Sequence, residues 1–83
     1  MTQSKRIKIY VYLLDEGTDV WRPVEAIHLN DDIYQIVSEK LDPNELWAFK
    51  TGDTVRCELK ALTDSKPKKY LVAVEKAGGY HNP

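Results

Sequence analysis

The chain has few of the residues from which catalytic and metal sites are built. Its 83 residues include one cysteine and two histidines. A lone cysteine excludes an intramolecular disulfide and a zinc site built from thiolates within one chain. His28 and His81 lie far apart in the sequence and show no metal-ligand spacing. We therefore expect no metal and no cofactor.

Long apolar runs are also missing. No segment approaches the roughly 20 apolar residues that a membrane-spanning helix needs. The start, MTQSKRIK, leads into alternating sequence rather than into the apolar core of a signal peptide. Hydrophobic residues at 42% and charged residues at 30% are typical of a soluble globular chain. We therefore expect a cytoplasmic protein that binds no membrane.

Groups for covalent catalysis are scarce as well. Cys57 falls in the alternating run Val55, Cys57, Leu59 and Ala61, which predicts a buried small hydrophobic side chain. A reactive thiol requires a nearby base or helix start, and neither is evident. The four glycines are spaced like turns rather than like a phosphate-binding loop. These features predict a protein that is not an enzyme.

Period-two alternation of apolar side chains predicts an all-β protein. In KRIKIYVYLL, Ile7, Ile9 and Val11 fall on one face of a strand, and Tyr10 and Tyr12 on the other. A chain this short forms one domain with a thin core. We expect that domain over residues 1–76, followed by a flexible tail over 77–83. Further strands are expected at about 20–29, 33–37, 54–61 and 70–74.

Five short strands joined by short turns predict an antiparallel meander that closes into a small SH3-like barrel. An open sheet would leave one face bare, because no long helix is present to cover it. Asp42, Pro43 and Glu45 have the order of a capping box: an N-cap aspartate, a proline at the first helical position and a glutamate at the third. One short helical turn is therefore expected near 42–47.

The segment GTDVWRPVEA, residues 17–26, interrupts the alternation. Val24 and Ala26 share one parity, whereas Trp21 and Ile27 share the other. Because proline cannot donate a hydrogen bond within a sheet, the parity change predicts a bend at or near a bulge at Pro23. Gly17 is expected to turn the chain before this strand.

Charge is distributed unevenly along the chain. The formal net charge is −1, but residues 15–45 carry nine acidic side chains against Arg22 and Lys40, a net charge of −7. The segments on either side are mildly basic. A net negative chain is not typical of a general nucleic-acid binder, which needs clustered positive charge.

Meander geometry places these acids together. Alternate connections emerge at the same end of the sheet, so the loop 15–19 and the connection 38–53 should share an end that is acidic and aromatic. Such a surface suits a small interaction module that binds a basic protein or peptide, which would include an inhibitor or immunity-type role. Alternatively, the two tryptophans fill the ends of the core, and the acidic side chains are ordinary solvated charges of the loops. The candidate partner-binding residues are Asp19, Trp21, Arg22, Asp42, Glu45 and Trp47.

Two other functions remain open. Small barrels bind single-stranded nucleic acid through aromatic side chains that lie beside lysine and arginine side chains on an outer strand face. The same aromatic face would equally serve as the contact of a homo-oligomer. The residues of this alternative face are Lys8, Tyr10, Tyr12, Lys68 and Lys69, with Lys66 as an extension.

Several segments together resemble a set of small, single-domain bacterial proteins. The resemblance rests on WRPVEA at 21–26, W-x-F at Trp47 and Phe49, and G-D-x-V-x-C-E from Gly52 to Glu58. It spans roughly residues 7–75 and implies a small β barrel, but no reaction and no ligand. The tyrosine-rich motif and tryptophan pair of peptide-binding SH3 domains are absent, so their specificity is not implied.

Overall fold

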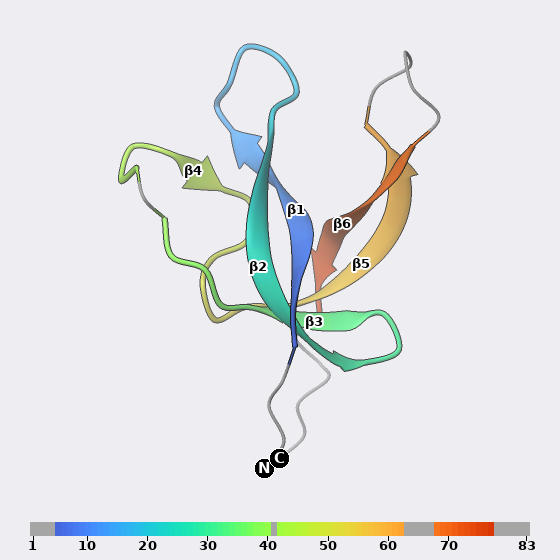
Figure 1. Cartoon of the computed structure of the whole chain (residues 1–83). Helices are drawn as coiled ribbons and strands as arrows, with labels where there is room; N and C mark the ends of the chain where they lie inside the picture. The colour runs from blue at the N-terminus through green and yellow to red at the C-terminus, as the bar shows by residue number, and fades with distance from the viewer. Residues whose placement is uncertain (1–4, 41, 63–67, 78–83) are drawn as a thin grey trace.

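The protein is an all-β molecule built around one mixed sheet (Figure 1). The computed structural model describes residues 5–40, 42–62 and 68–77. No helix occurs in these ranges, and so none that is long and apolar enough to cross a membrane. The strands are β1 (Arg6–Leu14), β2 (Trp21–Asn30), β3 (Ile33–Ile36), β4 (Leu46–Trp47), β5 (Thr54–Ala61) and β6 (Lys69–Lys76).

Hydrogen-bonded ladders run in a ring through five of these strands. β1 pairs with β2, β2 with β3, β3 with β5 and β5 with β6, each antiparallel, as the meander predicts. A parallel pairing between Tyr10 of β1 and Val72 of β6 closes the ring, so the sheet is mixed rather than wholly antiparallel. The strand β4 was not expected, and it pairs with the end of β1 outside the ring.

Alternation along β1 correctly predicts which side chains are buried. Ile9 and Val11 are fully buried and Leu13 is 2% exposed, whereas Tyr10 and Tyr12 between them remain partly exposed. The other strands turn their own apolar side chains toward this row and form a single core cluster. Its further buried members are Val24, Ala26, Ile36, Trp47, Val55, Cys57 and Ala73.

The predicted bulge at Pro23 is wrong. The register of β1 with β2 runs without a shift from Arg6 to Tyr12, with Tyr10 opposite Pro23; the irregularity of β2 lies between His28 and Asn30. Leu13 N donates to Val20 O at 2.9 Å, and hydrogen-bonded pairs recur at every second residue. The Tyr10–Pro23 pair therefore falls where no N–H toward β1 is needed, so proline is tolerated without a bulge.

The chain also has no change of face between Trp21 and Ile27 of β2. Val24 and Ala26 are buried, whereas Trp21 and Ile27 lie on the outer face and are only partly covered. Trp21 and Ile27, which alternate with the buried Val24 and Ala26, therefore belong to the outside of the sheet. Alternation continues through the segment that the sequence made look interrupted.

The predicted helical turn near 42–47 is wrong as well. Asp42 Oδ1 accepts from Asn44 N at 2.9 Å, and Glu45 N donates to Asp42 O at 3.1 Å, which closes a turn rather than a helix. The chain then becomes extended, because Leu46 and Trp47 pair with β1. Capping chemistry was present in the sequence, but it serves a tight turn before a strand.

The left-handed residues of the turns differ partly from expectation. Asp15 has a φ of 60° in the β1–β2 loop, and Gly17 does not have a positive φ. Gly52 has a φ of 92° in the turn before β5, as a glycine turn requires. Of the expected tail, Ala77 donates its N–H to Thr54 O at 2.9 Å, and 78–83 lies outside the described residues.

Cys57 provides a direct test of this core. Its side chain is 2% exposed, and burial raises the pKa of the thiol to about 12. At pH 8 the folded protein therefore holds almost no thiolate, whereas an unfolded chain, with a thiol pKa of about 8.5, holds a substantial fraction. We expect a disulfide reagent to react at least about a hundredfold more slowly with native than with urea-unfolded protein. The reaction is followed by the absorbance of the released chromophore. Equal reaction rates in the native and the urea-unfolded protein would contradict the burial of Cys57.

Candidate functional site

Trp47 closes one end of the core and anchors the candidate site. It pairs with Leu13, Leu46 pairs with Leu14, and Ala48 N donates to Tyr12 O at 2.9 Å. These bonds hold the long connection between β3 and β5 against the end of β1. The Trp47 side chain is 9% exposed, so it is a core plug, the alternative considered for it above. Its indole keeps a polar handle toward the surface.

Glu45 is the polar partner of that indole. Trp47 Nε1 donates to Glu45 Oε1 at 3.0 Å, and Arg22 grips both carboxylate oxygens, with Nε at 3.2 Å from Oε1 and Nη2 on Oε2. The Arg22 guanidinium and then the indole lower the pKa of Glu45, and the carboxylate in turn raises the pKa of Arg22. Lys40 Nζ donates to the Glu45 carbonyl at 2.9 Å. Glu45 is therefore occupied within the protein.

The segment after β3 is held against β2 beyond the end of the β2–β3 pairing. Val37 N and Ser38 N donate to Glu25 O at 3.0 and 3.3 Å. Ser38 Oγ accepts from Glu25 N at 2.7 Å, a bond that β3 would otherwise have supplied. The exposed Glu39 and Lys40 follow directly, so this anchor places their charges beside Trp47.

A hollow of about 330 Å³, lined by both charged and apolar side chains, lies between β2 and this segment. It brings together four of the predicted residues, Arg22, Asp42, Glu45 and Trp47. Glu39 joins them, as one of the acids of the 38–53 connection that the meander geometry was expected to place at this end of the sheet. The lining thus holds three carboxylates and one guanidinium. We call this the acidic hollow; its lining residues are Arg22, Pro23, Val24, Ser38, Glu39, Asp42, Glu45 and Trp47.

Trp21 and Asp19 lie on a different surface. Successive side chains of a strand point to opposite faces, so Trp21 turns away from its neighbour Arg22. The Trp21 ring packs edge-on against Tyr12, with centroids 5.1 Å apart. Tyr12 Oη donates to Asp19 Oδ1 at 3.0 Å, and this carboxylate raises the pKa of Tyr12. The predicted site is therefore divided between two faces of β2.

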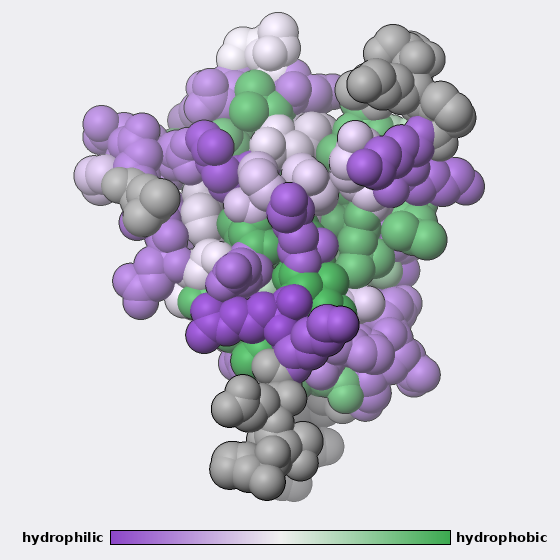
Figure 2. Space-filling model, viewed as in Figure 1, coloured by the Kyte–Doolittle hydropathy of each residue, from purple (hydrophilic) through white to green (hydrophobic). Residues whose placement is uncertain are grey.

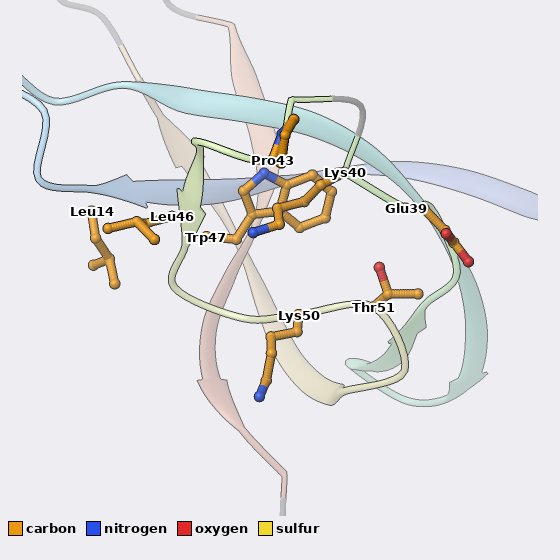
Figure 3. A pocket seen from close by; sticks show the side chains of 8 residues that line it. All are labelled: Leu14, Glu39, Lys40, Pro43, Leu46, Trp47, Lys50 and Thr51. Carbon is orange, nitrogen blue, oxygen red and sulfur yellow. The ribbon is translucent and has the colours of Figure 1, made fainter.

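An apolar groove of about 660 Å³ (Figure 3) shares Glu39 and Trp47 with the acidic hollow. Leu14 and Leu46 are cross-strand partners and are 44% and 45% exposed. Sequence reasoning missed this groove, because the two leucines become neighbours only through β4. Its lining residues are Leu14, Glu39, Lys40, Pro43, Leu46, Trp47, Lys50 and Thr51.

Other chemistry has little to build on in the described ranges. No group of three histidine, cysteine or acidic side chains there could hold a metal ion. His28 Nε2 donates to the Asp31 carbonyl at 2.7 Å, and its ring lies 4.8 Å from that of Tyr34. His81 lies outside the described residues.

Comparison with protein-family models, with curated proteins and with solved structures found no match to this chain. The resemblance to small bacterial single-domain proteins therefore stays a prediction.

The Glu45 contacts predict how the site responds to acid. Because the folded pKa of Glu45 is lowered, its contacts are present above the ordinary value of 4.5 and are lost as the pH falls through the lower folded value. We expect the Trp47 indole N–H resonance in NMR spectra to titrate with a midpoint below 4.5. Arg22→Gln should move this midpoint upward.

Arg6→Gln is the matched control for this titration. Arg6 Nη1 also forms an ion pair with a glutamate, Glu25, at 2.8 Å and away from Trp47. The control should leave the midpoint unchanged. A midpoint that ignores Arg22→Gln, or that moves equally in both variants, would show that the Arg22–Glu45 pair does not form in solution.

Proposed function

We propose that the protein is a small, non-enzymatic interaction module that binds a basic protein or peptide surface at the acidic hollow. The observation that supports this most directly is the excess of carboxylates there, since Glu39, Asp42 and Glu45 line the hollow with Arg22 as its one cation. An inhibitor or immunity-type protein acting on a basic target would use such a surface. The proposal extends to a cytoplasmic location, as expected from composition.

Within the hollow, two carboxylates remain for a partner. Glu45 is occupied by Arg22 and Trp47, whereas Glu39 and Asp42 form no ion pair among the described residues. Glu16, from the β1–β2 loop, lies near enough to contribute to the raised pKa of Arg22. An incoming arginine or lysine would therefore meet Glu39 and Asp42 in a field that further acids reinforce.

The apolar groove supports the same proposal by offering contact area next to the charges. Interfaces typically combine a desolvated apolar centre with a polar rim. Leu14 and Leu46 provide apolar surface, and Glu39 and Trp47 line both depressions. A partner with a basic residue followed by an apolar one would fill both.

We also propose that the fold is a small barrel of the SH3-like kind. The ring of ladders through β1, β2, β3, β5 and β6 supports this reading, as does a single core cluster to which all five of these strands contribute buried or partly buried side chains. A closed sheet of this type presents its connections as binding surfaces, which is consistent with a site built from the 37–53 connection.

An NMR titration with a short arginine-containing peptide tests the function. Amide shifts should concentrate on residues 37–47 and on Arg22. The double variant Glu39→Gln, Asp42→Asn should weaken binding roughly tenfold, since each exposed charge pair contributes up to about 1 kcal/mol. A peptide in which a neutral side chain of similar shape replaces the arginine should bind more weakly than the arginine peptide, by a similar factor.

Asp31→Asn serves as the matched control for charge. It removes one carboxylate in the β2–β3 turn, which lies at the other end of β2 from the hollow (Figure 1). Asparagine also tolerates the φ of 41° at this position. Equal loss of binding in the control, or shifts confined to Lys8–Tyr12 and Lys68–Lys69, would refute the proposed site.

A further inference from the structure

Four aromatic side chains form a continuous row outside the core. Tyr10 and Tyr12 lie on the outer face of β1; Tyr70 packs edge-on against Tyr10 at 5.1 Å and Trp21 against Tyr12 at 5.1 Å. All four are partly exposed. We call this row, Tyr70–Tyr10–Tyr12–Trp21, the aromatic strip. It joins β6, β1 and β2 across the outside of the ring.

The surface over β1 and β2 has the character that such a row would give. In Figure 2, side chains of intermediate hydropathy lie beside green, hydrophobic patches near the centre of the face, with strongly hydrophilic side chains around them. The strip is distinct from the acidic hollow, because Trp21 and Arg22 point to opposite faces of β2. A ligand on the strip would therefore not compete directly for the hollow.

Lysines gather at the Tyr70 end of the strip. Lys68 Nζ lies 5.5 Å from the centroid of the Tyr70 ring, and Lys60 is the cross-strand partner of Tyr70. Lys69 precedes Tyr70, and Lys8 lies two residues before Tyr10 on the same face of β1. All four lysines are exposed. The sequence suggested Lys8, Lys68 and Lys69, whereas the β5–β6 pairing adds Lys60.

The acids nearest these lysines are already paired. Glu25, the cross-strand partner of Lys8, binds Arg6 at 2.8 Å. Glu58, two residues before Lys60, binds Arg56 Nη1 at 2.7 Å. The carboxylate of Asp19 lies at the opposite end, on the Tyr12 hydroxyl. The strip is therefore polarised, with positive charge at Tyr70 and negative charge near Trp21.

From this arrangement we propose that the Tyr70–Tyr10 half of the strip binds single-stranded nucleic acid. Bases would stack on the exposed parts of the tyrosine rings, and phosphates would contact Lys8, Lys60 and Lys68. Aromatic platforms combined with a basic groove bind single strands without strong sequence preference. The net charge of −1 does not oppose this, because local charge decides phosphate contact.

Fluorescence anisotropy with a short labelled oligothymidylate tests the proposal. Binding should weaken steeply between about 50 and 200 mM salt, with a log–log slope near −0.7 for each phosphate contacted. Lys60→Ala and Lys68→Ala should each reduce the magnitude of that slope by about 0.7. These lysines are exposed, so folding should not be affected.

A second test of the proposal removes one of the stacking rings. Tyr70→Ala should weaken binding roughly five- to a hundredfold, the range seen for loss of one base–aromatic stack. Tyr70→Phe, which keeps the ring, should bind almost as the native chain does. This conservative variant separates loss of stacking from loss of folding.

Lys50→Ala is the control for charge, since Lys50 is an exposed lysine in the apolar groove, away from the strip. Lys50→Ala should leave the affinity for the oligonucleotide unchanged. The double variant Glu39→Gln, Asp42→Asn should leave it unchanged as well. Three results would overturn the proposal: no binding at low salt, salt-independent binding, or equal losses in Lys50→Ala and Lys68→Ala. Light scattering that gives a dimer for the native chain and a monomer for Tyr10→Lys would also overturn it, because the strip would then be a subunit contact.

Discussion

The pairing of β4 with the end of β1 is the contact on which the candidate site depends. Two residue pairs, Leu13–Trp47 and Leu14–Leu46, hold the connection between β3 and β5 against the ring. Burial of a tryptophan side chain supplies the driving force, since large aromatic side chains dominate the energetics of small cores. Without this contact neither the acidic hollow nor the apolar groove would exist, because both are lined by Trp47 and by residues of that connection.

The strand β1 organises the rest of the molecule. One of its faces supplies Ile9, Val11 and Leu13 to the core, and the other supplies Tyr10 and Tyr12 to the aromatic strip. It also contacts β2, β4 and β6 through its backbone. A single alternating strand thereby separates an enclosed interior from an aromatic exterior. The same alternation in β2 sends Trp21 to the strip and Arg22 to the hollow.

Most strands could be predicted because their signal is local. Alternation over eight or more residues marks β1 and β5, and the turns around Asp31 and Gly52 mark where strands must end. The failures share a cause. A capping box is compatible with both a helix and a tight turn, and a proline in a strand is harmless or disruptive depending on its place in the hydrogen-bonding register. Local sequence cannot decide either question.

By itself, the sequence determined an all-β chain, a buried Cys57, and an acidic middle segment with aromatic neighbours. These properties follow from side-chain periodicity and composition, which need no knowledge of distant contacts. Only the tertiary structure decided that Trp47 is a core plug while Trp21 lies outside, and that Glu45 joins Arg22 to the indole. Those relations depend on register and on the return of the 37–53 connection. Both are set by cooperative burial across the whole sheet rather than by any one segment.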